Sequence, residues 1–207
     1  MSGKTGFWSN VNPNSITWTR IVLTTILDIL LLINNFWTLL ISLPLYTIVA
    51  VSDKLDGWVA RKYNKTSLFG EMLDRVADKL FICSNLIILT YGLYCQGYLT
   101  WYLYGLGAFI TIVIEIILFA NAVKGYRTKK TGGQAQVAAG INGKAKMGIQ
   151  IGVTAAAVLS LFLFKLDYQI TDSIANGLMS LAIIAYIPGI FFGIESIKSH
   201  RQKKSSL

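Results

Sequence analysis

Residues 53–78 read DKLDGWVARKYNKTSLFGEMLDRVAD and hold five of the ten acidic residues in this chain of 207. Long apolar segments flank this stretch on both sides. The single charge between residues 21 and 52 is Asp28, and the single charge between residues 80 and 123 is Glu115. Uncharged apolar runs of this length are typical of helices that cross a membrane. The acidic stretch therefore marks the connection between two such helices.

The composition agrees with a membrane location. Hydrophobic residues make up 54% of the chain, charged residues make up 14%, and the mean hydropathy is +0.54. These values exclude an ordinary soluble domain. Two cysteines in apolar stretches, Cys83 and Cys95, exclude a disulfide framework and a zinc ribbon.

The charge-free runs predict an all-α polytopic membrane protein with six transmembrane helices. The chain is expected to form a single membrane domain over residues 1–207, with a cytosolic loop over residues 124–146 that includes the glycine-rich stretch 131–143. Short turns are expected at Asn34 and Asn35 and at Gln96 and Gly97. The expected spans are residues 16–34, 37 to about 61, a pair from about 70 to about 123, 147–164 and 173–194.

Basic residues predict the orientation, because cytoplasmic loops retain lysine and arginine. The connections on one side hold only Lys165. Both termini are therefore expected in the cytoplasm, with a short interfacial helix around residues 7–16, and the net charge of +9 does not indicate nucleic-acid binding. The basic residues of the other side are Lys4, Arg61, Lys62, Lys65, Lys124, Arg127, Lys129, Lys130, Lys144, Lys146, Lys198, Arg201, Lys203 and Lys204.

The acidic residues of the stretch have helical spacing. Asp53 and Asp56 are three residues apart, and Asp74 and Asp78 are four apart on the next helix, so each pair shares a helix face. Two helices joined by a short loop can direct both pairs into one space. Like charges persist there around divalent cations or with raised pKa values. Oxygen ligands favour Mg²⁺ or Mn²⁺ over zinc.

Small residues and one arginine accompany these acids. Gly57, Ala60 and Gly70 leave room for a bulky ligand beside the carboxylates, and Arg61 is suited to a phosphate. In the plainer interpretation, the acids pair with nearby cations across helix faces, namely Arg61, Arg75 and Lys79. An interpretation from another class of protein is a divalent-cation transporter, which would carry acids near the midplane on several helices.

Written with its spacing, the stretch is Asp53-x2-Asp56-Gly57-x2-Ala60-Arg61-x8-Gly70-x3-Asp74-x3-Asp78. This pattern resembles the signature of the CDP-alcohol phosphotransferase family, also called the CDP-alcohol phosphatidyltransferase family. The resemblance implies a six-span enzyme of phospholipid biosynthesis with its active site facing the cytoplasm. Such enzymes transfer a substituted phosphate from a CDP-linked donor to an alcohol and release CMP, with two divalent cations, Mg²⁺ or Mn²⁺, held by the aspartates.

The resemblance also implies roles for single residues. Asp53, Asp56, Asp74 and Asp78 would bind the metal ions, with Asp74 and Asp78 as catalytic residues and Asp78 as a candidate general base. The CDP-linked donor is expected to be CDP-diacylglycerol, whose acyl chains stay in lipid. The donor-binding residues would be Asp53, Asp56, Gly57, Ala60, Arg61 and Gly70.

Three shorter segments indicate the subfamily. Asn14-Ser15-Ile16-Thr17-x2-Arg20, Gly125-Tyr126-Arg127 and Gly143-Lys144-Ala145-Lys146 are similar to segments of phosphatidylglycerophosphate synthases. This similarity predicts glycerol 3-phosphate as the acceptor, with its phosphate bound by Arg127, Lys144 and Lys146. Phe119 and Ala120 stand where those enzymes carry an Arg-Glu pair. Inositol phosphate, or phosphatidylglycerol giving cardiolipin, therefore remains an alternative acceptor.

Two further features concern helix packing. The pairs Gly148/Gly152 and Gly189/Gly193 are small-xxx-small patterns, which are typical of close helix packing or of a dimer face. Relatives in the resembled family are often homodimers, and these glycines are compatible with one. Asp28 and Glu115 are isolated intramembrane acids, each either functional or hydrogen-bonded to a neighbouring helix.

Overall fold

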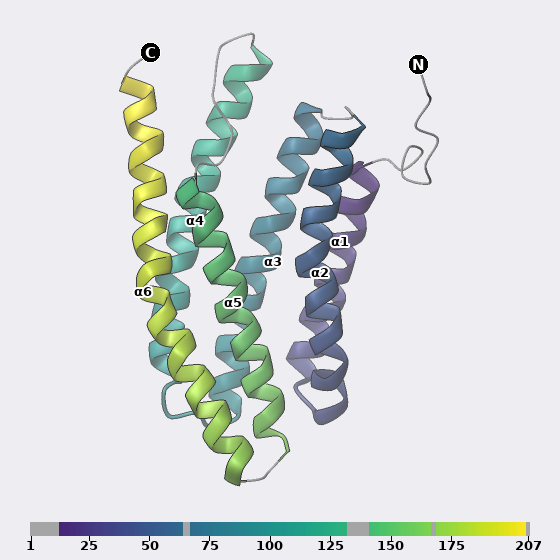
Figure 1. The fold of residues 1–207 in the computed structure, drawn as a ribbon, viewed down its shortest axis with the longest axis vertical. Coiled ribbons are helices and arrows are strands. Elements are labelled where there is room, and N and C mark those ends of the chain that lie inside the picture. Colours follow the sequence, from purple (N-terminus) through teal and green to yellow (C-terminus); the bar gives the residue numbers. More distant parts are fainter. Residues whose placement is uncertain (1–12, 64–66, 132–140, 167–168, 206–207) are drawn as a thin grey trace.

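A computed structural model describes residues 13–63, 67–131, 141–166 and 169–205, and these residues form six α-helices (Figure 1). Each helix contains a segment long and apolar enough to cross a membrane. The all-α, six-helix prediction is confirmed, and most of the expected interfacial helix lies outside the described residues. The helices are α1 (Pro13–Ile33), α2 (Phe36–Lys62), α3 (Leu68–Cys95), α4 (Trp101–Lys130), α5 (Ile141–Phe164) and α6 (Gln169–Ser205).

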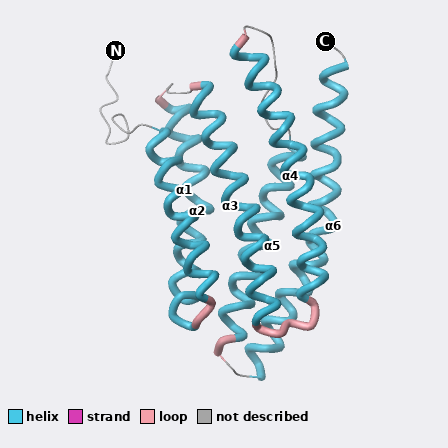
Figure 2. Tube along the Cα trace, turned by 180° about the vertical axis from the view of Figure 1, so that it is seen from behind, coloured by secondary structure: helices cyan, strands magenta, loops and turns pink. Residues whose placement is uncertain are grey.

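Two predicted turns lie where the sequence places them. Asn34 ends α1 in the left-handed backbone region with φ of 51°, and the Asn35 side chain accepts a hydrogen bond from the Thr38 backbone amide at 2.9 Å. Asn35 therefore caps α2. The turn after α3 uses Gly97 with φ of 73°, a conformation that glycine adopts without strain. Figure 2 shows the α1–α2 and α3–α4 loops at the end of the bundle opposite the termini.

Helix α3 lies in the middle of the bundle. It packs against α1, α4 and α5, while α5 also packs against α2 and α6. The described chain begins and ends at the same end of the bundle (Figure 1). Residues on different faces of α3 therefore contact different neighbours.

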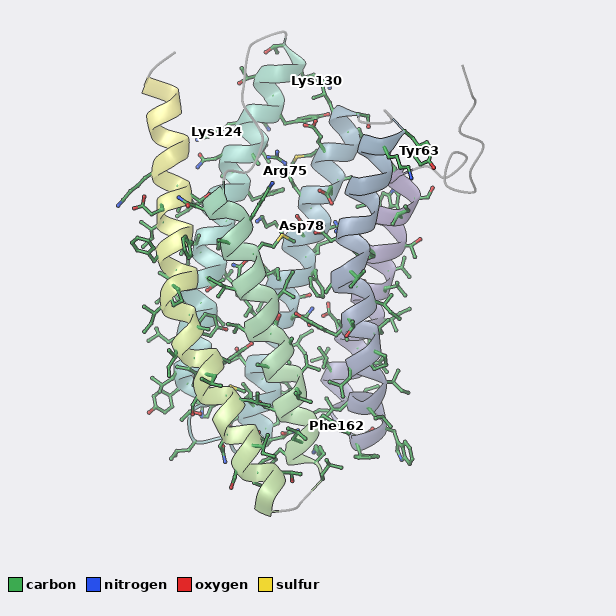
Figure 3. The ribbon with its side chains drawn as sticks, viewed as in Figure 1. Tyr63, Arg75, Asp78, Lys124, Lys130 and Phe162 are labelled. Atoms are coloured by element: carbon green, nitrogen blue, oxygen red, sulfur yellow. The ribbon has the colours of Figure 1, made fainter. Side chains whose placement is uncertain are left out.

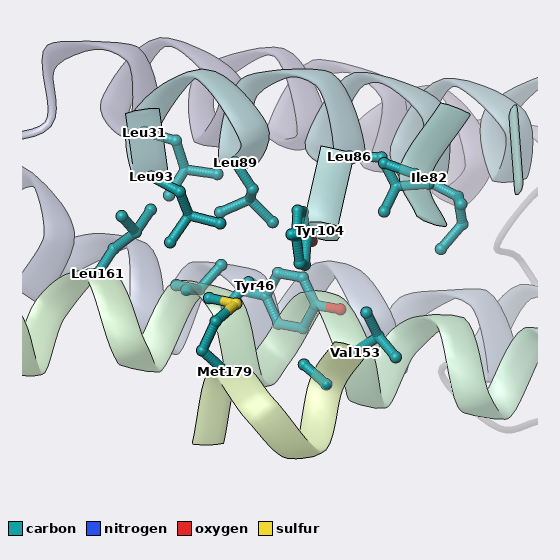
Figure 4. Packing of buried hydrophobic residues seen from close by; sticks show 14 of the residues in the cluster. Leu31, Tyr46, Ile82, Leu86, Leu89, Leu93, Tyr104, Val153, Leu161 and Met179 are labelled. Carbon is teal, nitrogen blue, oxygen red and sulfur yellow. The ribbon is translucent and has the colours of Figure 1, made fainter. Parts of the chain in front are cut away.

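The bundle has an apolar exterior and polar residues inside. Trp37 is 69% exposed and Ile187 is 71% exposed, whereas Arg20 and Glu115 are almost completely buried. Between the polar groups lies a core of apolar side chains from all six helices, among them Leu89, Tyr104 and Leu161 (Figure 4). An exterior of this kind needs contact with lipid. The fold fits a multi-pass membrane protein.

The predicted loop over residues 124–146 requires a correction. Residues 124–130 continue α4, and α5 already begins at Ile141. Lysine and arginine are good helix formers, and helical hydrogen bonds continue beyond the membrane. The basic residues therefore mark the end of an apolar span and not the end of a helix.

The pairs Gly148/Gly152 and Gly189/Gly193 differ in how closely neighbouring helices approach them. A Cβ atom at Gly189 would lie 3.2 Å from Cγ2 of Ile149, and one at Gly193 would lie 2.9 Å from Cγ2 of Ile114. This pair allows α6 to approach α5 and α4 closely. A Cβ atom at Gly148 or Gly152 would meet no atom within 4 Å, so neither glycine serves packing among the described residues.

We expect Gly107→Ala to destabilise the bundle. A Cβ atom at Gly107 on α4 would lie 2.5 Å from Cδ2 and 2.7 Å from Cγ of the buried Tyr186 on α6. Overpacking of this kind costs about 1–3 kcal/mol. The measurement is the thermal unfolding midpoint of the purified protein in detergent micelles. Gly177→Ala on α6 is the matched control, because its new methyl group meets no atom within 4 Å, and equal midpoints for the two variants would contradict the α4–α6 packing.

Candidate functional site

Three carboxylates from two helices converge in the half of the bundle nearer the termini. Asp53 lies near the end of α2, while Asp74 and Asp78 lie in the first three turns of α3. Each of the three offers a carboxylate oxygen, and these oxygens all lie within 4.8 Å of one another. Figure 3 shows Asp78 well above Phe162, which lies at the opposite end. The predicted meeting of the two helical acid pairs is confirmed for these three residues.

Arg20 of α1 lies among the three carboxylates. Its guanidinium donates to Oδ1 of Asp53, to Oδ1 of Asp74 at 2.7 Å and to the Asp74 backbone carbonyl at 3.2 Å. It also forms an ion pair with Oδ1 of Asp78 at 3.2 Å. The Arg20 side chain is only 2% exposed, whereas the three carboxylates remain partly exposed, with Asp74 the most open at 42%. Arg75 of α3 also interacts electrostatically with Asp74 and Asp78, so two guanidinium groups act on the three carboxylates.

The sequence pattern suggests Arg61, Arg75 and Lys79 as the partners of the aspartates, but the cation that pairs with all three carboxylates is Arg20. Lys79 points to another face of α3, and Arg75 interacts electrostatically with Glu71, Asp74 and Asp78 from α3 itself. In the sequence, Arg20 ends the segment Asn14-Ser15-Ile16-Thr17-x2-Arg20, but nothing in that pattern predicts its contact with the aspartates. It is separated from Asp74 by 54 positions, and only the α1–α3 packing brings them together.

The beginnings of α1 and α3 meet at Gly70. A Cβ atom at Gly70 would lie 2.7 Å from Oδ1 of Asn14 and 3.0 Å from Oγ of Ser67. Ser67 caps α3 by accepting a hydrogen bond from the Gly70 amide at 3.0 Å. Gly70 therefore allows α1 to approach the first turn of α3, and this approach helps to bring Arg20 to the aspartates.

Four predicted site residues lie on α2 outside the residues whose side chains the structure describes. They are Asp56, Gly57, Ala60 and Arg61. Their backbone is helical and continues directly from Asp53. Their place on α2 is thus known, and their roles stay predictions.

A second buried cluster lies on another face of α3. Glu115 of α4 accepts hydrogen bonds from Lys79 of α3 and from Lys146 and Gln150 of α5, the last at 2.6 Å. Glu115 is 1% exposed and Lys146 is 4% exposed. Glu115 thus has charged partners, where the sequence suggests hydrogen-bonding side chains such as asparagine, threonine or tyrosine.

The three basic residues predicted to bind the acceptor phosphate are not equivalent in the structure. Lys146 is buried in the Glu115 cluster. Arg127 and Lys144 are exposed, near the end of α4 and the start of α5 respectively. Figure 3 shows Lys124 and Lys130 in the same end region of α4.

The donor set of the acidic site fits a divalent cation. Three carboxylates from two helices supply hard oxygen ligands, and Arg20 already shows that the position accepts positive charge. Among the described residues, Arg20 and Arg75 are the cations that act on these carboxylates, and Arg75 also interacts with Glu71, so the acids outnumber the cations. A divalent cation or a pair of them would remove this imbalance.

Sequence comparison gives the chain a family. A family profile described as CDP-alcohol phosphatidyltransferase matches residues 10–187. Three similar proteins are each named CDP-diacylglycerol--glycerol-3-phosphate 3-phosphatidyltransferase. The Bacillus subtilis protein is 34% identical over 89% of this chain and 90% of its own length. The Rickettsia typhi protein is 36% identical over 37% of this chain, and the Salmonella choleraesuis protein is 31% identical over 52%. The chain spans about half the length of these last two relatives, 44% and 56% respectively.

We expect Arg20→Met to bind the first Mn²⁺ ion more tightly than the wild-type protein. The guanidinium contacts the same carboxylate oxygens that a cation would use, so its removal ends a competition and a charge repulsion. The dissociation constant should fall about tenfold or more, which corresponds to about 1.4 kcal/mol. The measurement is electron paramagnetic resonance of free Mn²⁺ during titration of the purified protein.

Lys124→Met is the matched control, because Lys124 is an exposed cation on α4 away from the aspartates. Its Mn²⁺ affinity should equal that of the wild type. Weaker Mn²⁺ binding by a folded Arg20→Met protein would show that Arg20 organises the carboxylates for the ion and does not compete with it.

Proposed function

Because this chain belongs to the CDP-alcohol phosphatidyltransferase family, we propose that it transfers a phosphatidyl group from CDP-diacylglycerol to glycerol 3-phosphate and releases CMP. The observation that carries the proposal is the convergence of Asp53, Asp74 and Asp78 near one end of a bundle of apolar helices. The name of the Bacillus subtilis relative supports the choice of donor and acceptor.

The place of the acids favours a transferase over a cation transporter. The carboxylate cluster lies near the end of α2 and the start of α3, toward the end of the bundle where the termini lie. A site at a membrane surface suits a reaction between a lipid headgroup and a water-soluble alcohol. A transport site would instead be expected near the midplane.

Two divalent cations, Mg²⁺ or Mn²⁺, are the proposed cofactors. Asp53, Asp56, Asp74 and Asp78 would hold them. When bound, such ions neutralise a diphosphate and polarise the phosphorus under attack. The chain itself supplies the ligands and, through Arg20, a cation that balances part of their charge.

The donor would lie against the ends of α2 and α3. Gly57, Ala60 and Gly70 would leave room for the cytidine nucleotide, and Arg61 would bind the diphosphate, as in the family signature. Leu68 and Phe69 at the start of α3 are exposed, and an apolar surface beside the site supports a donor whose acyl chains remain in lipid.

Asp78 is the proposed general base. Its contact with Arg20, at 3.2 Å, is longer than that of Asp74, at 2.7 Å, so its carboxylate is less constrained by the guanidinium. The carboxylate would accept the hydroxyl proton of the acceptor as the alcohol oxygen attacks the phosphatidyl phosphorus. The bond from that phosphorus to the bridging oxygen of the diphosphate breaks, and CMP leaves with the electron pair.

The acceptor phosphate would bind to basic residues at the ends of α4 and α5. Arg127 and Lys144 are exposed there, and Lys146 lies deeper, beside Glu115. Inositol phosphate and phosphatidylglycerol also carry a phosphate and a hydroxyl group, so the same residues could serve them. The acceptor in the relatives' names supports glycerol 3-phosphate over these alternatives.

The orientation and assembly follow from charge and from small residues. We place both termini and the site on the cytoplasmic side, because the basic residues flank the spans at that end. A homodimer is the proposed assembly, and the open face at Gly148 and Gly152 of α5 is a candidate for its interface.

We expect the purified protein, in vesicles that contain CDP-diacylglycerol, to release CMP when Mg²⁺ or Mn²⁺ and glycerol 3-phosphate are both added. The assay compares glycerol 3-phosphate, inositol phosphate, serine, inositol and phosphatidylglycerol, and identifies the lipid product by mass spectrometry. Removal of the metal with a chelator should abolish the reaction. Asp78→Asn should lower kcat by about 10²–10⁴, as expected for loss of a general base.

Asp28→Asn is the matched control, because Asp28 is an acid of α1 outside the cluster, and its activity should stay within about twofold of the wild type. Product from another acceptor alone would contradict the choice of glycerol 3-phosphate. Release of no CMP with any acceptor, or full activity of Asp78→Asn, would contradict the proposed reaction.

A further inference from the structure

The Glu115 cluster joins three helices next to the acidic site. Lys79 comes from α3, Glu115 from α4, and Lys146 and Gln150 from α5. Lys79 directly follows Asp78 in the sequence, so the two side chains leave α3 about 100° apart around its axis, at neighbouring levels. The acidic site and the Glu115 cluster therefore lie on adjoining faces of α3.

Both carboxylate oxygens of Glu115 are used. Lys79 donates to Oε2, while Lys146 and Gln150 share Oε1. A buried carboxylate with three donors from two helices is held in one orientation. The two ammonium groups are thereby fixed relative to each other, because one rigid group binds both.

The cluster carries more positive than negative charge. Two ammonium groups face one carboxylate, and among the described residues the charges that act on Lys146 are those of Glu115 and Lys79, with the Cys83 thiol nearby. An excess charge is costly at a buried position, and Lys146 is almost completely buried. The Lys79 side chain is 28% exposed, so the cluster is open on the side of Lys79.

The two faces of α3 thus have opposite charge. The face with Asp74 and Asp78 adjoins Asp53, and the carboxylates there outnumber the cations Arg20 and Arg75 that act on them. The face with Lys79 is positive, because Lys79 and Lys146 share the single carboxylate of Glu115. A molecule with a phosphate group and a hydroxyl group has matching polarity. Its phosphate would lie toward the lysines, and its hydroxyl would lie toward the aspartates.

Helix α6 holds the stem of Lys146 from the other side. A Cβ atom at Gly193 would lie 3.6 Å from Cδ of Lys146 and 2.9 Å from Cγ2 of Ile114, the neighbour of Glu115. The aliphatic chain of Lys146 therefore packs against a glycine while its ammonium group binds Glu115. The position of this lysine is set at both ends of its side chain.

We propose that Glu115 is a positioning residue that orients the ammonium groups of Lys79 and Lys146 to bind the phosphate of an anionic alcohol acceptor. The proposal rests on the proposed phosphatidyl transfer and adds the residue that makes the site selective for a charged acceptor. Glu115 touches neither substrate. It acts through the two lysines, and it keeps two like charges close together inside an apolar bundle.

The test measures KM and kcat of Glu115→Gln for glycerol 3-phosphate and for CDP-diacylglycerol. Loss of the two charge-assisted hydrogen bonds should raise KM for glycerol 3-phosphate about tenfold or more, while KM for CDP-diacylglycerol stays near the wild-type value. Lys146→Met should have the same effect. In the double variant the two effects should not add, because Glu115 acts through Lys146.

Asp28→Asn is again the control for a lost membrane acid. An unchanged or lower KM for glycerol 3-phosphate in Glu115→Gln, an equal rise of KM for both substrates, or full additivity in the double variant would overturn the proposal. If Glu115→Gln does not fold, Lys79→Met and Lys146→Met decide alone, since each leaves Glu115 with one lysine, and wild-type KM values in both would overturn it. Wild-type protein that is inactive with glycerol 3-phosphate but active with another acceptor contradicts the proposed function instead.

Discussion

Three carboxylates side by side inside an apolar helix bundle repel one another, and the Arg20 guanidinium offsets this repulsion in the described structure. The contact requires α1 to cross beside both α2 and α3, and Gly70 permits the close approach of α1 to α3. The cap at Ser67 fixes where α3 begins and therefore the level of Asp74 and Asp78. The local geometry of α1, α2 and α3 thus keeps the Arg20 guanidinium in contact with the three carboxylates.

Helix α3 links the acidic site to the Glu115 cluster. Its acidic face meets α1 and α2, and Lys79 on another face meets Glu115 of α4 and, through it, Lys146 of α5. Neighbouring sites with unbalanced charges of opposite sign, one partly and one almost completely buried, are expensive to maintain without ligands. Divalent cations on one face and an anionic acceptor on the other would satisfy both, which is the reason that the structure suits transfer to a phosphate-bearing alcohol.

Much of the fold and part of the site could be predicted from sequence, because local spacing determines them. The apolar runs predict six helices, Asn34 and Gly97 mark turns, and the spacing of Asp74 and Asp78 predicts a shared helix face. Contacts between distant segments could not be predicted in this way. Arg20 and the aspartates meet only through α1–α3 packing, and the Glu115–Lys146 pair depends on the packing of α3, α4 and α5. The prediction that a loop begins at residue 124 is wrong, because basic residues mark the membrane surface, whereas α4 continues to Lys130.

The central claim is that the acidic site exchanges the positive charge of Arg20 for divalent cations. The most direct measurement is a crystal structure of the protein soaked in Mn²⁺, with anomalous scattering to locate the ions. We expect anomalous peaks among Asp53, Asp74 and Asp78, with the Arg20 guanidinium moved away from the oxygens that it binds in the metal-free structure. No peak at these carboxylates, with Arg20 still bound to all three, would contradict the claim.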